Sequence, residues 1–299
     1  ITEELLLNGR LKLAETLRIS YSKKLDELGV LEEATEGNPG TAAIHGGASD
    51  NETVDHFTYR FPASSGRIEF VTISPNDEMV PVSNAILSTF SKGEVSVLDI
   101  PGGAGAAICS LLATLAVLRK DGVIPTLPMT VRVVCGDIAP KANEIYSEMI
   151  SKIEPFLNEN AISIQYDSMV WDATRNDNTA QLIDKWFSIS KPTSEYVVCV
   201  SNFTGALIGA GILEEFKPCL SQILARLHDK KSTLLWVEPG SKSTNKLIGK
   251  LIDYFSSAIK WFKGPNKDEG FLASKYTMIN PLNGNEHPSS VEVQQFERV

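Results

Sequence analysis

The chain has 299 residues, of which 42% are hydrophobic and 22% charged, and its mean hydropathy is −0.05. These values are typical of a globular protein and exclude a mainly disordered, collagenous or coiled-coil chain. The net charge of −9, from 28 basic and 37 acidic residues, argues against a large nonspecific nucleic-acid surface, because such surfaces are built from lysine and arginine.

The cysteines and hydrophobic segments limit the class of protein further. Four cysteines are spread along the chain: Cys109, Cys135, Cys199 and Cys219. They form no CxxC pair, so we expect no disulfide-linked partner and no metal site. The longest hydrophobic stretch, residues 102–118, contains three glycines and is too short to cross a membrane, so no membrane partner is expected. These features favour a reducing, cytoplasmic location, although a targeting segment removed ahead of Ile1 would escape notice.

Residues 1–92 are predicted to form an extension in front of the main domain. Leucines at helical spacing predict an amphipathic helix over residues 3–30. Residues 31–55 are rich in Gly, Ala, Glu and Asn without any period and predict a flexible loop. Two β-like runs around Ser-Ser-Gly predict a β-hairpin within residues 56–75, and a helix is predicted at 82–90.

Residues 93–299 are predicted to form a Rossmann-like, doubly wound α/β domain, because apolar β-type runs alternate with amphipathic segments. Strands are predicted at 95–100, 131–135, 162–166, 196–200 and 233–237. Helices are predicted near 105–120, 140–158, 178–188, 211–229 and 243–261. Two further strand-like runs, 271–280 and 290–299, flank an Asn-Gly turn and predict a C-terminal antiparallel hairpin. The expected sheet is mostly parallel and seven-stranded.

A glycine-rich turn follows the first of these strands, in the sequence VLDIPGGAGAA (97–107). Open α/β sheets bind ligands at the carboxyl ends of their strands. Glycines there let the backbone approach a ligand closely, and the helix that follows offers free N–H groups. A tight turn without a ligand has the same sequence pattern, so the turn alone is a weak signal.

Acidic residues follow successive strand ends. Asp99 ends the first strand, Asp137 and Ile138 follow the second, and Asp172 and Ala173 follow the third. A carboxylate after the second strand suits the two hydroxyls of a ribose, and an isoleucine beside it can cover a purine. Each acid alone is an ordinary surface or cap residue, but the three in this order are a more specific pattern.

Residues 95–299 resemble the class I S-adenosylmethionine-dependent methyltransferases in the glycine turn, the acids, the SNFTG segment (201–205) and the terminal hairpin. The resemblance implies S-adenosylmethionine as the cofactor. It also implies roles for individual residues: Gly103 and Gly105 contact the methionine portion, Asp99 helps to hold its amino group, Asp137 binds the ribose, and Asp172 and Ala173 contact the adenine.

The chain departs from this family at Pro101, where glycine is usual. Proline fixes φ and removes an N–H group. We expect Gly102 and Gly103 to take over the turn and to present N–H groups to the cofactor's carboxylate.

A weaker resemblance concerns YRFPAS (59–64) and WVEPGS (236–241), which are similar to motifs of a ribosomal small-subunit methyltransferase-like family. That family normally carries a cysteine cluster for metal, which this chain lacks, and an acidic protein suits an rRNA substrate poorly. The similarity therefore indicates a remote relationship in fold and not a substrate.

Methyl transfer needs an acceptor atom in line with the methyl–sulfur bond and often the loss of a proton. The candidates lie after the fourth and fifth strands: Asn202 to accept a hydrogen bond from an amine, Glu238 as base and Phe203 to stack on the substrate. Asn202 as a cap and Glu238 as part of a turn are the alternatives. Tyr59 and Arg60, with the neighbouring Phe61, are expected to line the substrate side, and the alternative is packing outside the sheet.

Three functions are compatible with the sequence. The preferred one is a methyltransferase whose unknown substrate is a small molecule, a protein or an RNA. The second is a catalytically inactive relative that serves as a binding or scaffold subunit, which Pro101 and the missing Asn/Asp-Pro-Pro-Tyr signature favour. The third is a nicotinamide-dependent oxidoreductase, but its G-x-G-x-x-G fingerprint is broken at Ile108.

Overall fold

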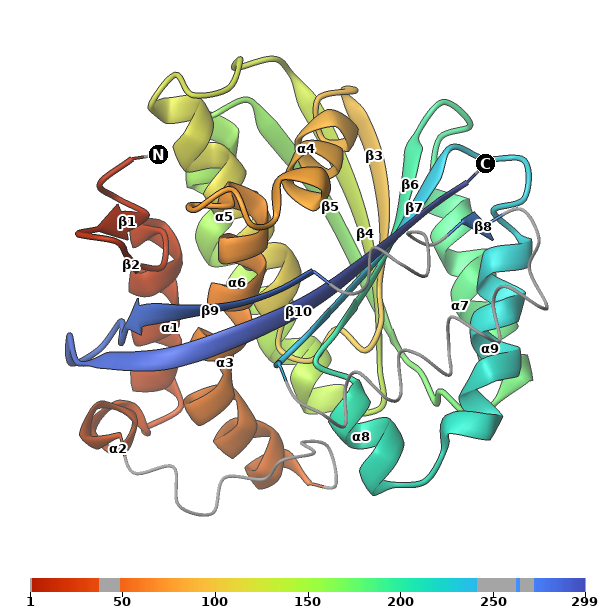
Figure 1. Cartoon of the computed structure of the whole chain (residues 1–299). Coiled ribbons are helices and arrows are strands. Elements are labelled where there is room, and N and C mark those ends of the chain that lie inside the picture. The colour runs from red at the N-terminus through yellow and green to blue at the C-terminus, as the bar shows by residue number, and fades with distance from the viewer. Residues whose placement is uncertain (1, 38–48, 241–261, 264–271, 299) are drawn as a thin grey trace.

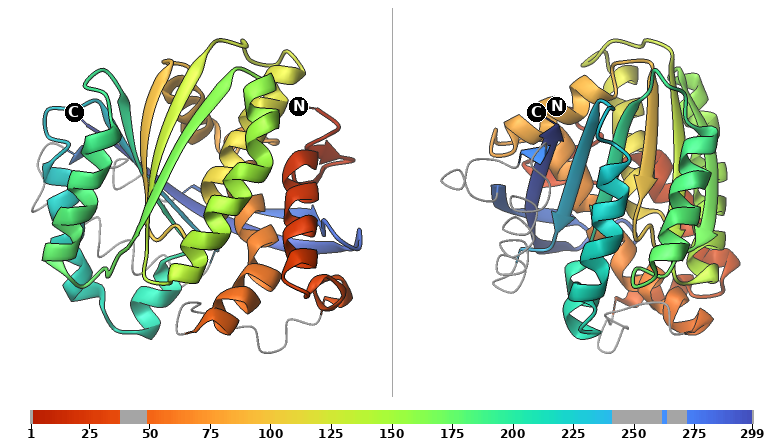
Figure 2. Two further views of the ribbon diagram at one scale, coloured as in Figure 1. Left: turned by 180° about the vertical axis from the view of Figure 1, so that it is seen from behind. Right: turned by 90° about the vertical axis from the view of Figure 1, so that its right-hand side faces the viewer.

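A computed structural model describes residues 2–37, 49–240, 262–263 and 272–298 (Figure 1). A single mixed sheet forms the centre, and helices pack on both of its faces, as Figure 2 shows from behind and from the side. The helices within residues 15–159 share one hydrophobic core with one face, and those within residues 176–225 share a second core with the other. The N-terminal extension therefore packs into the same core as the sheet.

Within the described residues, the sheet has ten strands in the order β1-β2-β9-β10-β7-β6-β3-β4-β5, with β8 beside β10. Five parallel strands occupy its centre: β3 (Glu94–Asp99), β4 (Met129–Asp137), β5 (Ile162–Val170), β6 (Glu195–Ser201) and β7 (Ser232–Glu238). The antiparallel pair β9 (Leu272–Ile279) and β10 (Glu286–Arg298) follows beside β7. These seven strands confirm the predicted doubly wound sheet and its terminal hairpin.

Three short strands extend this sheet: β1 (Leu6–Leu7), β2 (Arg10–Leu11) and β8 (Phe262–Lys263). The register brings the strand ends together, because Asp99 at the end of β3 pairs with both Cys135 of β4 and Cys199 of β6. Strand order reverses between β3 and β6, so the carboxyl ends of these strands border the position where such sheets bind ligands.

The helices after the strands lie close to their predicted positions: α5 (Ala106–Lys120), α6 (Pro140–Glu159), α7 (Asn176–Ile189) and α9 (Leu213–Ala225). The short α8 (Thr204–Gly209) precedes α9, and α4 (Val80–Thr89) confirms the helix predicted at 82–90. The helix predicted at 243–261 lies outside the described residues.

The N-terminus differs from the single helix predicted over 3–30. β1 and β2 form a hairpin across Asn8 and Gly9, whose φ values are 51° and 77°. Asn-Gly is the sequence that two-residue hairpin turns prefer, because both positions need positive φ. The helix α1 is shorter than expected (Glu15–Glu27), and α2 (Leu31–Glu36) occupies the start of the predicted loop. Residues 38–48 of that loop lie outside the described part of the chain.

The predicted β-hairpin within residues 56–75 is wrong, because this segment belongs to the long helix α3 (Asp50–Ile73). The hydroxyl of Ser49 accepts a hydrogen bond from the N–H of Glu52 and caps the helix. The Ser-Ser-Gly segment of α3 does not form a turn but packs against β9 and α5. A Cβ on Gly66 would lie 2.6 Å from Met278 Sδ of β9, and the hydroxyl of Ser110 on α5 donates to the carbonyl of Ser65 at 2.8 Å.

Pro62 lies inside α3 and leaves the carbonyl of Thr58 without its usual helical donor. The hydroxyl of Tyr21 on α1 donates to that carbonyl at 2.5 Å. The ring of Tyr21 also packs against Phe57 and Phe61. A buried tyrosine of α1 therefore compensates the proline of α3, and the two helices stabilise each other.

Replacing Tyr21 with phenylalanine keeps the ring packing but leaves the Thr58 carbonyl buried without a donor. We expect Tyr21→Phe to lower the free energy of unfolding by about 1–3 kcal/mol, measured by urea denaturation. Tyr59→Phe is the matched control, because the Tyr59 hydroxyl donates to the exposed side chain of Glu33. Its effect should stay within about 0.5 kcal/mol. Equal losses in the two variants would contradict the role of Tyr21.

Candidate functional site

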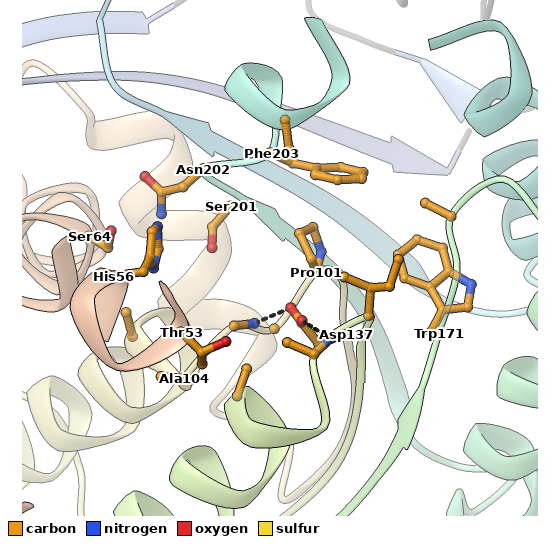
Figure 3. Close-up of a pocket in the computed structure, with 18 of the residues that line it drawn as sticks. Thr53, His56, Ser64, Pro101, Ala104, Asp137, Trp171, Ser201, Asn202 and Phe203 are labelled. Atoms are coloured by element: carbon orange, nitrogen blue, oxygen red, sulfur yellow. Dashed lines mark hydrogen bonds between the residues drawn. The ribbon is translucent and has the colours of Figure 1, made fainter. Parts of the chain in front are cut away.

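A cavity of about 390 Å³ lies at the carboxyl ends of the parallel strands, and Figure 3 shows it with residues that line it. Its wall combines the turn after β3, the segments after β4, β5 and β6, the first half of α3, and α8. This volume is within the range of small-molecule binding sites. The cavity thus lies where the topology predicts a ligand.

The glycine turn after β3 forms one side of this cavity. Gly103 and Gly105 have φ values of 51° and 84°, which glycine adopts without steric penalty. A Cβ on Gly105 would lie 2.3 Å from the ring of Tyr146, whereas a Cβ on Gly103 would meet nothing within 4 Å. Packing therefore requires a glycine at 105, and Gly103 leaves open space on the cavity side.

Pro101 also lines the cavity, at the start of the turn. The first N–H groups of the turn come from Gly102, which donates to the carbonyl of Gly136 at 3.1 Å, and from Gly103. Gly103 takes the positive φ that we expected of a shifted turn. Gly102 does not, and it packs instead, since its Cβ would lie 2.3 Å from Cys135 Sγ.

Asp137 follows β4 and joins the turn to the neighbouring strand. Its Oδ2 accepts the N–H of Gly103 at 2.8 Å, and its Oδ1 accepts the N–H of Ala139 at 2.9 Å. The residue is only 7% exposed, and burial raises the pKa of its carboxyl group against the lowering effect of these N–H groups. A carboxylate has about four lone-pair sites, so each oxygen of Asp137 can accept one more hydrogen bond from a ligand in the cavity.

Asp99 does not line the cavity, in contrast to its predicted contact with a ligand amino group. It is fully buried beneath the turn, where Oδ2 accepts the hydroxyl of Tyr146 at 2.9 Å. Burial raises the pKa of Asp99 to about 7. The residue supports the turn from inside the core, because strand β3 directs this side chain inward.

The segments after β4 and β5 form a second, more apolar part of the wall. Ile138, which is 56% exposed, and Ala173 both line the cavity there. Asp172 lines it as well, and its Oδ1 accepts both the N–H and the hydroxyl of Thr174. Trp171, which sequence analysis did not single out, adds a buried indole. Of the predicted residues, Asp137, Ile138, Asp172 and Ala173 are therefore brought together around one space.

Asn202 and Phe203 follow β6 and line the cavity on the side of α3 and α8. Phe203 packs between Trp171 and Phe216, with ring centroids 6.5 and 5.1 Å away. Asn202 Oδ1 accepts hydrogen bonds from Arg67 Nε and Nη2 at 3.0 and 2.6 Å. The expectation that this oxygen receives an amine of the substrate is wrong, because a buried arginine of α3 already occupies it.

Glu238 at the end of β7 does not line the cavity either. Its Oε1 accepts the N–H groups of Phe203 and Thr204 and the indole N–H of Trp236, at 2.8–3.0 Å. Burial raises the pKa of its carboxyl group. The start of α8 presents unpaired N–H groups to this carboxylate. The structure therefore assigns Glu238 to holding α8, and not to the role of base.

Helix α3 reaches over the carboxyl ends of the strands, as expected of the segment before β3, but mainly with other residues. Phe61 lines the cavity, whereas Tyr59 and Arg60 point away from it, and Arg60 is exposed. The lining residues of this helix are spaced along one helical face: Thr53, His56, Phe57, Phe61 and Ser64. If the segment had been predicted as a helix, this spacing would have placed these residues on one face of it.

Among the residues that the structure describes, no group of three or more His, Cys, Asp or Glu side chains is placed to hold a metal ion. No helix of that part of the chain is long and apolar enough to cross a membrane. The four cysteines are buried and unpaired.

Comparisons with known proteins find remote structural similarity only. No family model matches the chain, and no curated protein matches its sequence. A structure described as a class I S-adenosylmethionine-dependent methyltransferase from Listeria monocytogenes is 11% identical, with a TM-score of 0.34 over 95% of this chain and 79% of that one. Another, from work on the conversion of a disulfide bond into a thioacetal group during echinomycin biosynthesis, is 11% identical, with a TM-score of 0.36 over 72% and 81%.

The strand order itself identifies the fold. The sequence β5-β4-β3-β6-β7-β10-β9, with β10 antiparallel, is that of the class I methyltransferase fold, so the predicted fold resemblance is confirmed as a remote one.

The raised pKa of Asp99 has a consequence for stability. An aspartate in the unfolded chain titrates near 3.9. The contribution of Asp99 to the free energy of unfolding is therefore fully present below about pH 4, and it is lost as the pH rises to about 7. We expect the free energy of unfolding of Asp99→Asn, relative to that of the native protein, to be roughly 2–4 kcal/mol more favourable at about pH 8 than at about pH 5. Urea denaturation at the two pH values measures this difference.

Asp121→Asn, at the exposed end of α5, is the control for this titration. Its stability difference from the native protein should change by less than about 0.5 kcal/mol over the same interval. A stability difference for Asp99→Asn that is the same at both pH values would show that Asp99 ionises normally.

Proposed function

We propose that the protein is an S-adenosylmethionine-dependent methyltransferase. The observation that carries the proposal is one cavity bordered by three features: the open side of Gly103, the carboxylate of Asp137 and the apolar segment at Ile138. They occupy the reversal point of a doubly wound sheet, where a nucleotide-like ligand lies across adjacent strand ends.

The residues around the cavity fit this cofactor. Asp137 keeps one acceptor site on each oxygen, which suits the two hydroxyls of a ribose. Ile138, Ala173 and Trp171 supply apolar surface for an adenine ring. Gly103 has no side chain in the space that the methionine portion would fill. When bound, S-adenosylmethionine supplies a methyl group on a positively charged sulfur.

The acceptor substrate would enter from the side of α3, where Phe57 and Phe61 offer apolar contacts. Three lining residues within the described part of the chain have side chains that can accept a proton: His56, Asp137 and Asp172. Both carboxylates hold backbone N–H groups of their own segments. We assign His56 as the proton acceptor because of its position: it lies beside Ser64 and Asn202 in Figure 3, away from the ribose site.

A binding subunit with the same fold is the second candidate. The observation in its favour is the hydrogen bond from Gly103 to Asp137, because that N–H is no longer available to a cofactor. The two candidates differ in whether the cavity binds the cofactor at all.

Calorimetric titration distinguishes them. We expect S-adenosylmethionine and S-adenosylhomocysteine to bind with micromolar Kd and NAD not to bind, because Asp137 and the apolar slot select the adenosine while the turn lacks a dinucleotide fingerprint. Failure of both sulfur compounds to bind at millimolar concentration, in folded protein, would support the binding subunit instead.

The matched variants of this titration are Gly103→Val and Gly122→Val. Both glycines have positive φ and empty space around a Cβ, so the backbone penalty is similar. Only the Gly103 side chain would enter the cavity. We expect Gly103→Val to weaken S-adenosylhomocysteine binding by about 100-fold or more and Gly122→Val to leave it unchanged. Equal affinities would place the ligand elsewhere.

A further inference from the structure

Arg67 fixes the orientation of the Asn202 amide. The guanidinium group is buried in α3 and donates to Asn202 Oδ1 from Nε at 3.0 Å and from Nη2 at 2.6 Å. A guanidinium group has only donors, so the amide atom that faces it is the oxygen. The amide nitrogen Nδ2 is consequently turned away from Arg67, and Figure 3 shows it directed toward His56.

The backbone of Asn202 reinforces this orientation. Its φ is 55°, in the left-handed region that asparagine tolerates better than most residues, and its N–H donates to the carbonyl of Val237 at 2.9 Å. The residue is therefore held at both its backbone and its side-chain oxygen. What it can still offer a ligand is the pair of N–H groups on Nδ2.

Ser64 provides a second donor beside it. Its Oγ accepts Arg67 Nη2 at 3.3 Å, so its own hydrogen is left for another acceptor. Both Ser64 and Asn202 line the cavity. Within the ranges that the structure describes, neither Asn202 Nδ2 nor the Ser64 hydroxyl hydrogen has an acceptor in the protein. Two donors thus face the substrate side of the cavity.

The charge of Arg67 strengthens these donors. No carboxylate of the described residues lies within ion-pair distance of Arg67. The ionisable groups that act on it are Tyr276, Glu238 and Arg60. Glu238 is already hydrogen-bonded to three donors around α8. A buried cation without an ion-pair partner polarises the groups that bridge it to the cavity, which favours an electron-rich ligand atom.

We propose, resting on the methyltransferase function proposed above, that the acceptor substrate carries a carboxylate or carbonyl oxygen close to the atom that is methylated, and that Asn202 Nδ2 and Ser64 Oγ bind this oxygen. A protonated amine at the same position would meet two donors and the positive charge of Arg67. The site therefore selects acyl compounds and rejects amines, opposite to the amine-binding role expected of Asn202 from the sequence.

Three probes with one planar apolar body test this polarity: benzoate, benzamide and benzylamine. They are titrated into isotope-labelled protein while the side-chain amide signal of Asn202 is followed by NMR. We expect benzoate and benzamide to shift this signal and benzylamine to leave it in place at the same concentrations. Preferential binding of benzylamine, or no shift with any probe at about 10 mM, would overturn the proposal.

Asn202→Asp replaces the amide donor with an acceptor and adds a negative charge, while a carboxylate oxygen can still face Arg67. We expect it to weaken benzoate binding, followed by the ligand's own signals, by at least about tenfold. Asn158→Asp adds the same charge on an exposed turn of α6 and should change benzoate binding less than about twofold. Ser64→Ala, a variant that keeps the Arg67–Asn202 contact, should weaken benzoate binding about three- to tenfold.

The outcomes separate this proposal from the proposed function. Benzoate selectivity in a protein that does not bind S-adenosylhomocysteine would sustain the polarity of the site and contradict the methyltransferase. Binding of S-adenosylhomocysteine together with unchanged benzoate affinity in Asn202→Asp would contradict the roles of Asn202 and Arg67 alone.

Discussion

The hydrogen bond between the N–H of Gly103 and the carboxylate of Asp137 is the constraint on which the site depends. It ties the turn after β3 to the segment after β4, and the N–H of Gly102 reinforces it by donating to Gly136. Because Pro101 has no N–H, these are the first two donors of the turn, and both are directed at the neighbouring strand. The turn is consequently held open, with the bare face of Gly103 toward the cavity. The same carboxylate retains acceptor sites, so one side chain shapes the site and can also bind a ligand within it.

The opposite wall depends on a helix that the local sequence disfavours. Pro62 interrupts the hydrogen bonding of α3, and the Tyr21 hydroxyl on α1 replaces the lost donor. Beyond the proline, small residues let α3 approach α5 and β9 closely. This packing places Ser64 and Arg67 beside the end of β6, where they determine which atoms of Asn202 face the cavity. Tertiary contacts far from the cavity thereby determine which polar groups line its wall beside α3.

The parts of the fold that the sequence predicts well are those with a strong local pattern. Strands β3, β4, β6 and β7 are buried along almost their whole length and read as mainly apolar runs, whereas the edge strand β5 is only partly buried. The terminal hairpin carries an Asn-Gly turn. Helix α3 was missed because its β-branched and aromatic residues, with Ser-Ser-Gly, resemble a hairpin, while its Ser49 cap is a weaker signal. That error also hid His56, Ser64 and Arg67. The burial of Asp99 and Glu238 depends on which side of a strand end each side chain takes, which strand prediction alone does not reveal.

We propose that the cavity at the reversal point of the sheet holds S-adenosylmethionine. A crystal structure of the protein with S-adenosylhomocysteine tests this proposal most directly. We expect the ribose hydroxyls on the two oxygens of Asp137, the adenine between Ile138 and Ala173, and the sulfur between Gly103 and Asn202, facing His56. A ligand bound outside this cavity, or a ribose without contact to Asp137, would contradict it.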